Sequence, residues 1–200
     1  MIHIPSPPIY LKNIALSFLE IGFYSLPVIG MTAIFTGAVL AMQTYLGFSR
    51  LNAEGAIASV VTISIIRELG PVIGGLMVAG RISSSIAAEI GTMKVTEQLD
   101  ALRTLSTNPY KYLYAPKVIV GTLVMPFLVL VTDIIGIYGG FIVAVYKLGF
   151  NPDIYIQKSF DFIELYDLFS GLCKAAVFGF IITTIGCYCG QECTRGAKGV

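Results

Sequence analysis

Apolar and charged positions divide this chain into long uncharged segments separated by short polar ones. No charged residue lies between Glu20 and Arg50, and the segment 21–48 is long enough to cross a bilayer with some tilt. Three further segments are almost as apolar, and these are 55–80, 118–146 and 168–190. Barrel strands would instead alternate between apolar and polar residues over about ten positions. The pattern predicts an all-α polytopic membrane protein with four transmembrane helices.

Two other segments have the pattern of amphipathic helices. In 82–105, apolar residues recur at helical spacing with charged residues between them, which predicts a helix outside the membrane, ended by the turn residues from Ser106 to Pro109. Its apolar positions are Ile82, Ile86, Ile90, Met93, Leu99 and Leu102. The amphipathic pattern of residues 9–20 predicts a short helix that lies in the membrane interface.

The distribution of lysine and arginine predicts the orientation, because cytoplasmic loops collect these residues. On the side of the N-terminus there are eight: Lys12, Arg81, Lys94, Arg103, Lys111, Lys117, Arg195 and Lys198. On the other side there are three: Arg50, Lys147 and Lys158. We therefore expect the N-terminus in the cytoplasm and the acidic loop 147–167 outside. No cleavable signal peptide is expected, so the first span itself would direct the chain to the membrane.

Composition supports this class and excludes others. The chain has 200 residues, of which 56% are hydrophobic and 12% charged, and its mean hydropathy is +0.81. Soluble domains carry about 25% charged residues, so a soluble enzyme, a disordered chain and a disulfide-stapled secreted domain are all excluded. The net charge of +1 gives no basic surface for nucleic acid.

Charges inside the second span are the strongest functional signal. Arg67 and Glu68 lie near its middle, where an ionised side chain costs at least ~2.5 kcal/mol. Neighbouring residues on a helix point in different directions, so each charge needs a partner elsewhere. Pro71 cannot donate a hydrogen bond to the carbonyl of Arg67, which predicts a kink and a free carbonyl there. We interpret this as a polar site lining a cavity, with an interhelical lock as the alternative.

Asp133 and Lys174 are the other charges inside the predicted spans, and we expect them to be the partners of Arg67 and Glu68. Two simpler roles stay open. Lys174 could extend its ammonium toward the membrane surface, and Asp133 could be purely structural.

Glycines and cysteines add less. Pairs at G-x-x-x-G spacing predict close helix packing, at Gly70/Gly74, Gly136/Gly140 and Gly186/Gly190. The cluster of Cys187, Cys189 and Cys193 has no evident fourth ligand, so we expect neither a metal site nor a cofactor. No phosphate-binding loop or catalytic constellation occurs, and we therefore do not expect the chain to be an enzyme.

One long motif resembles a known family. Residues 67–113 read RELGPVIGGLMVAGRISSSIAAEIGTMKVTEQLDALRTLSTNPYKYL, which resembles the signature of the MlaE (YrbE) family of ABC-transporter permeases. The similarity continues through Ala115-Pro116-Lys117, through DIIGIYGG at 133–140, through CKAAVFG at 173–179 and into GCYCGQECTRGAKGV at the end. The resemblance implies that residues 1–200 form one permease domain. Such permeases move phospholipid or related lipids between the inner and outer membranes of Gram-negative bacteria, or in plastids.

The resemblance also implies partners and roles. The expected assembly is a homodimer with two copies of a cytoplasmic ABC ATPase and a ring of MCE-domain subunits, and in several such systems a STAS-domain protein accompanies the ATPase. Arg67 and Glu68 match the family's cavity residues, Lys174 matches its lysine, and 82–105 matches its coupling helix. We expect the ATPase to dock on Ile86, Glu89, Ile90, Met93, Lys94 and Glu97. The family pattern has a further span after Gly196–Val200, so we expect a fifth helix to be missing here.

Three functional hypotheses follow. The first is the permease subunit of an ATP-driven lipid transporter in the bacterial inner membrane. The second is a proton- or ion-coupled secondary transporter that uses Arg67, Glu68, Asp133 and Lys174 as a relay. The third is a membrane scaffold in which these residues are only structural. The amphipathic helix favours the first, because a secondary carrier does not need a docking element of this length.

Overall fold

Helices make up nearly all of the computed structural model, which describes residues 11–49 and 56–193. The α-helices are α1 (Leu11–Ile21), α2 (Leu26–Phe48), α3 (Ile57–Ser64), α4 (Gly70–Val78), α5 (Ser84–Val95), α6 (Gln98–Thr104), α7 (Ala115–Tyr146), α8 (Pro152–Asp161) and α9 (Leu165–Gln191). Four helical runs are long and apolar enough to cross a membrane: Asn13–Phe48, Ile57–Val95, Tyr110–Tyr146 and Leu165–Gln191. The predicted all-α polytopic class is confirmed.

Among the described residues, two π-helical turns lie within the second run, at η4 (Ile65–Leu69) and η5 (Ala79–Ser83), and a third, η6 (Tyr110–Tyr114), begins the third run. In η4 the N–H of Gly70 donates to the carbonyl of Ile65, five residues back. The next residue, Pro71, has no N–H to donate, so the regular α-helical pattern cannot continue through this turn. A short 3₁₀ turn, η1 (Phe23–Ser25), joins α1 to α2.

The amphipathic segment differs from its prediction. We expected a break between a span 55–80 and a separate helix 82–105, but the helical run continues to Val95. No proline interrupts it near Gly80, and the hydroxyl of Ser84 donates back to the Gly80 carbonyl at 2.7 Å. The break comes instead at Glu97, whose φ of +59° ends α5 and starts α6. Residues 9, 10 and 55 of the predicted segments lie outside the described part of the chain.

The chain divides into two compact units. Unit 1 comprises Met1–Ser25, Met77–Met125 and Ala176–Val200, and unit 2 comprises Leu26–Leu76 and Pro126–Ala175.

Unit 2 is built on close backbone contact between α2 and α7. A Cβ atom added at Gly37 would lie 1.8 Å from the carbonyl oxygen of Gly136, and one added at Gly139 would lie 2.3 Å from that of Ile34. Beside this contact, α3 contributes buried Ile57 and Val61. The predicted role of Gly136 and Gly140 in tight packing is confirmed.

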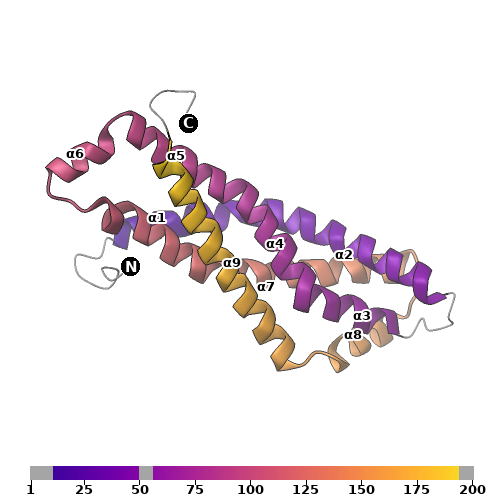
Figure 1. Ribbon diagram of the computed structural model, residues 1–200. Helices are drawn as coiled ribbons and strands as arrows, with labels where there is room; N and C mark the ends of the chain where they lie inside the picture. The colour runs from indigo at the N-terminus through magenta and orange to yellow at the C-terminus, as the bar shows by residue number, and fades with distance from the viewer. Residues whose placement is uncertain (1–10, 50–55, 194–200) are drawn as a thin grey trace. The chain divides into compact units, whose positions relative to one another are not determined.

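The segment after α7 contains a helix that the sequence did not lead us to expect, within the predicted loop 147–167. Asn151 begins α8, because its side-chain oxygen accepts hydrogen bonds from the N–H groups of Asp153 and Ile154. Pro152 occupies the first helical position, where its missing N–H does no harm. The hydroxyl of Ser59 donates to the carbonyl of Lys158 at 3.0 Å and joins α8 to α3, which lies beside it in Figure 1.

Unit 1 has α5 packed on the last turns of α9 (Figure 1). Cβ atoms added at Gly186 and Gly190 would lie 3.0 Å from the Ser83 carbonyl oxygen and 2.7 Å from the Cβ of Ile90. The predicted close packing at this glycine pair is therefore also confirmed. Ile90 itself is fully buried.

Candidate functional site

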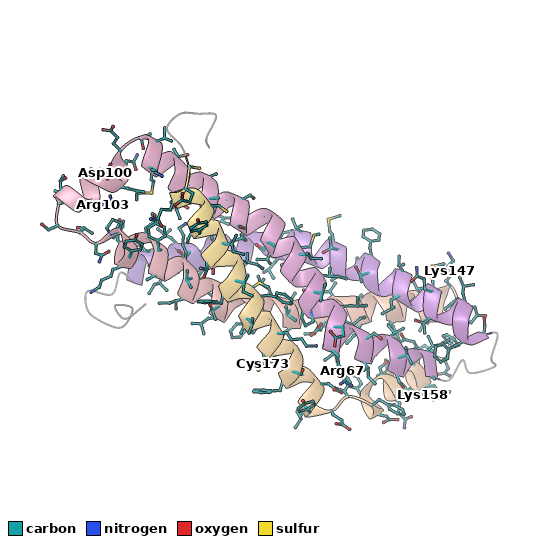
Figure 2. The ribbon with its side chains drawn as sticks, in the orientation of Figure 1. Arg67, Asp100, Arg103, Lys147, Lys158 and Cys173 are labelled. Atoms are coloured by element: carbon teal, nitrogen blue, oxygen red, sulfur yellow. The ribbon has the colours of Figure 1, made fainter. Side chains whose placement is uncertain are left out.

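Four charged residues of unit 2 form two ion pairs between η4 and α9. Glu68 Oε1 lies 2.8 Å from Lys174 Nζ, and Arg67 Nε lies 3.3 Å from Asp167 Oδ1. Arg67 is labelled in Figure 2, together with Cys173, the residue that precedes Lys174 on α9. Lys174 is thus one of the two expected partners, and Asp167 is a partner that the sequence reasoning had assigned to an outer loop.

The carbonyl freed by Pro71 is also used. Lys174 Nζ donates to the Arg67 carbonyl at 2.9 Å, in addition to its ion pair with Glu68. Pro71 has no N–H to offer this carbonyl, and the hydrogen bond that it accepts from Lys174 is charge-assisted, the stronger kind. The π-turn therefore presents one side-chain acceptor and one backbone acceptor to the same ammonium.

The spacing on α9 explains how both pairs form at once. Asp167, Gly171 and Lys174 follow the i, i+4, i+7 spacing and lie on one face of the helix. Between the two charges, a Cβ atom added at Gly171 would lie 2.6 Å from the Ile66 carbonyl oxygen. Glycine lets α9 approach the backbone of η4 closely enough for the side chains on either side to pair. This stripe is the signal in the sequence that could have identified Asp167.

These charges are unequally exposed. The side chains of Arg67, Glu68 and Lys174 are 51%, 65% and 39% exposed, whereas that of Asp167 is 9% exposed. Asp167 also lies in the first turn of α9, where the helix dipole favours a negative charge. Asp167 is a buried anchor, and the other three side chains present polar atoms outside the chain.

Asp133 is placed differently from its expectation. It is 4% exposed and takes part in no ion pair within the described residues. Its Oδ1 has no hydrogen-bond partner there and lies so close to Gly70 that a Cβ atom at that glycine would be 1.8 Å away. The expected pairing of Asp133 with Arg67 or Glu68 is wrong, because Asp133 packs on the backbone of Gly70 while α9 supplies both partners.

The six residues expected to dock an ATPase differ in how far their side chains are exposed. Ile86 and Ile90 are buried in unit 1, with 1% and 0% exposure, and therefore pack within the chain. Lys94 and Glu97 are exposed, and Met93 is half-buried. Docking on this segment stays a prediction, and the exposed residues would carry it.

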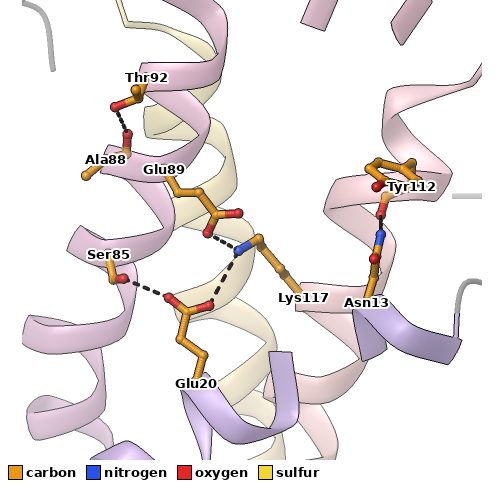
Figure 3. A network of polar contacts seen from close by, with 8 residues as sticks. All are labelled: Asn13, Glu20, Ser85, Ala88, Glu89, Thr92, Tyr112 and Lys117. Carbon is orange, nitrogen blue, oxygen red and sulfur yellow. Dashed lines mark hydrogen bonds and ion pairs between the residues drawn. The ribbon is translucent and has the colours of Figure 1, made fainter. Parts of the chain in front are cut away.

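Glu89, the sixth of these residues, belongs to a polar network in unit 1 that the sequence did not reveal. Its carboxylate accepts a hydrogen bond from Lys117, which we had counted only as a cytoplasmic positive charge. Figure 3 shows this pair together with Glu20 and Ser85. The ammonium of Lys117 is buried, with only 5% of the side chain exposed.

The cysteines at the end of α9 do not converge. Cys187 is buried, whereas Cys189 is exposed. Among residues 11–49 and 56–193, no three His, Cys, Asp or Glu side chains are grouped so that they could hold a metal ion.

The chain is similar to a family of known membrane proteins. A family model described as permease MlaE matches residues 14–200. A probable ABC transporter permease protein of Rickettsia typhi is 59% identical over 97% of this chain and 75% of its own length. One from Synechocystis is 40% identical over 100% of this chain and 76% of its own length. The chloroplastic protein TRIGALACTOSYLDIACYLGLYCEROL 1 of Arabidopsis thaliana is 36% identical over 96% of this chain and 55% of its own length.

Proposed function

Since this chain belongs to the MlaE family of ABC transporter permeases, we propose that it moves phospholipid or a related lipid at the expense of ATP hydrolysed by another subunit. The observation that supports this proposal is the exposed set of charges on η4 and α9. Charged side chains within a span avoid lipid tails and face a cavity or another chain. The name of the Arabidopsis relative contains that of a glycolipid, in keeping with a lipid substrate.

A lipid headgroup would bind by exchange at these charges. The guanidinium of Arg67 and the ammonium of Lys174 can both donate to phosphate oxygens. Each is already paired, with Asp167 and Glu68 respectively. A phosphate that enters would replace the exposed Glu68 more readily than the buried Asp167. Lys174 would meanwhile keep its hydrogen bond to the Arg67 carbonyl.

The proposed assembly follows the family. It is a homodimer in the bacterial inner membrane with cytoplasmic N-termini, bound to an ABC ATPase on the segment α5–α6 and to MCE-domain subunits on the opposite side. A STAS-domain protein would accompany the ATPase. Lys94 and Glu97, both exposed, are the residues through which this segment would contact the ATPase.

Lipid transfer between vesicles tests the proposal. The purified protein and its ATPase are reconstituted with a fluorescent phospholipid, and transfer is measured with and without ATP. Arg67→Ala and Glu68→Ala should each lower ATP-dependent transfer about tenfold, with Lys174→Ala intermediate, while the ATPase still binds. Lys147→Ala provides a control at an exposed lysine beyond the end of α7 and should leave transfer within about twofold.

Two results would contradict the proposal. Transfer driven by a proton or ion gradient without ATP would favour the secondary transporter. Normal transfer with Arg67 and Glu68 both replaced would remove them from the pathway and leave the interhelical lock as their role. Asp133→Ala separates packing from transport, because we expect it chiefly to lower the thermal stability in detergent.

A further inference from the structure

The network around Lys117 joins three helices of unit 1. Lys117, in the first turns of α7, donates to Glu89 of α5, and its Nζ lies 3.9 Å from Oε2 of Glu20, in the last turn of α1. The hydroxyl of Ser85, on α5, donates to the other oxygen of Glu20 at 3.0 Å. One buried ammonium thus holds acidic groups from two different helices.

Additional hydrogen bonds attach α1 and the following turn η1 to η5 and η6. Arg81 donates to the carbonyl of Glu20 at 3.4 Å and to the hydroxyl of Ser25 at 2.8 Å. At the other end of α1, the amide of Asn13 donates to the carbonyl of Tyr112 at 2.9 Å (Figure 3). The helix α1 is therefore attached to its neighbours through polar groups along its length.

A hollow opens on one side of this network. A hollow of about 220 Å³ lies beside the network, lined by residues of α1, α5, η6 and α7 that include Leu16, Glu20, Met93 and Lys117. Close packing on this side would otherwise hold the three helices together. Because of this hollow, the positions of α1, α5 and α7 relative to one another depend more on the ion pairs of Lys117.

We propose that Lys117 is a positioning residue that fixes α5 to α1 and α7, so that displacement of α5 by the ATPase is transmitted to the rest of unit 1. This role rests on the proposed function, because it assigns to Lys117 the efficiency with which ATP hydrolysis is coupled to lipid movement. Lys117 need not contact lipid or nucleotide for this role. Its effect depends on being buried between two acids.

Lys117→Met is the direct test, because it removes the cation and keeps the length of the side chain. Glu20 and Glu89 have side chains 38% and 40% exposed, so water can solvate them and the protein should still fold. Lys147→Met is the matched control, because it makes the same change at an exposed lysine beyond the other end of α7. Lys117→Arg is the rescue variant, because it keeps a cation between the same two acids.

Two measurements are made on the assembled transporter. Amide hydrogen exchange reports how firmly α1 and α5 are held, and the lipid transferred per ATP hydrolysed reports coupling. Lys117→Met should speed exchange in α1 and α5 and lower the transfer per ATP about tenfold, with ATP hydrolysis retained. The control should match the wild type, and Lys117→Arg should retain most of the coupling.

Each outcome has a definite meaning. Unchanged exchange in Lys117→Met overturns the attachment of α5 through Lys117. Faster hydrogen exchange in Lys117→Met with normal transfer per ATP overturns the positioning role. So does Lys117→Arg if its hydrogen exchange is normal but its coupling is lost. A wild-type protein that hydrolyses ATP through its partner but moves no lipid overturns the proposed function instead, and the exchange measurement still decides whether Lys117 holds α5.

Discussion

Lys117 in unit 1 and Lys174 in unit 2 each pair with a glutamate from another helix, yet their surroundings are opposite. The side chain of Lys117 is 5% exposed and that of Lys174 is 39% exposed. Their partners differ in the same direction, since Glu89 is 40% and Glu68 is 65% exposed. A buried ammonium depends on its protein partners, whereas an exposed one can exchange its partner for water or a ligand. The same two residue types therefore suit a fixed joint in one unit and an exchangeable site in the other.

The second acceptor of each lysine strengthens this contrast. Beside Glu89, Lys117 has another carboxylate nearby, that of Glu20. Beside Glu68, Lys174 has the backbone carbonyl of Arg67, which no side-chain movement can remove. Lys174 can thus release its glutamate and stay in place, which an exchangeable site requires.

The largest effect should come from removing the glutamate that pairs with the buried Lys117, and the same change beside the exposed Lys174 provides the comparison. Glu89→Ala removes the closer of the two acids beside the buried ammonium of Lys117 and leaves Glu20 at 3.9 Å, so it should lower the free energy of unfolding by about 3 kcal/mol. Glu68→Ala leaves Lys174 accessible and should cost less than about 1 kcal/mol. Denaturation in detergent measures both losses. Lys117→Met combined with Glu89→Ala should cost less than Glu89→Ala alone, and equal losses for the two single acid variants would contradict the comparison.

A smaller effect should follow from separating the helices at the exchangeable site. Gly171→Ala places a Cβ atom 2.6 Å from the Ile66 carbonyl oxygen, so α9 must move away from η4. We expect a loss of about 2 kcal/mol in stability, together with reduced lipid transfer, because Lys174 is withdrawn from Glu68. Gly47→Ala, where the added atom meets nothing within 4 Å, is the control. Normal transfer by Gly171→Ala would show that the pairing distance is not critical.

The smallest effect is expected from removing a buried hydroxyl group that has no partner to lose. Tyr155 on α8 is 4% exposed, and its hydroxyl has no hydrogen-bond partner among the described residues. Tyr155→Phe should therefore change stability at neutral pH by no more than about 0.5 kcal/mol. A loss well above this in thermal unfolding would indicate that the hydroxyl is hydrogen-bonded after all.

The same tyrosine gives a pH dependence. Burial raises the pKa of Tyr155 from 10.0 to about 12. Because the folded-state pKa is raised, the neutral phenol contributes stability that is fully present below pH 10.0 and is lost as the pH rises toward about 12. Tyr155→Phe should lack this alkaline loss in unfolding experiments across that range.

The sequence could predict features that depend on neighbouring residues, but not contacts between residues far apart along the chain. The four spans followed from uncharged length, and the free carbonyl of Arg67 followed from Pro71, since both depend on local chemistry. Asp167 was missed because it lies at the end of its span, where an acid looks like part of a loop. Only the close approach at Gly171 brings it to Arg67.

The end of a helix and the burial of a charged side chain were harder to predict from the sequence, because both depend on contacts between distant residues. Gly80 and Arg81 looked like the end of a span, but η5 passes through them and continues directly into α5, which ends at Val95. Lys117 looked like an ordinary surface charge, because nothing near it in the sequence reveals Glu20 or Glu89. A charged residue becomes a joint only through the helices that fold around it, and these are distant along the chain.

The π-turn η4 also makes the number of residues in this part of the second span important for the structure. A π-turn holds about one residue more than an α-helical turn, so the side chains within it point in directions that regular α-helical spacing does not give. Deleting one residue from Ile65–Leu69 would let this turn return to α-helical winding. Arg67 or Glu68 would then move by one position, about 100°, around the helix.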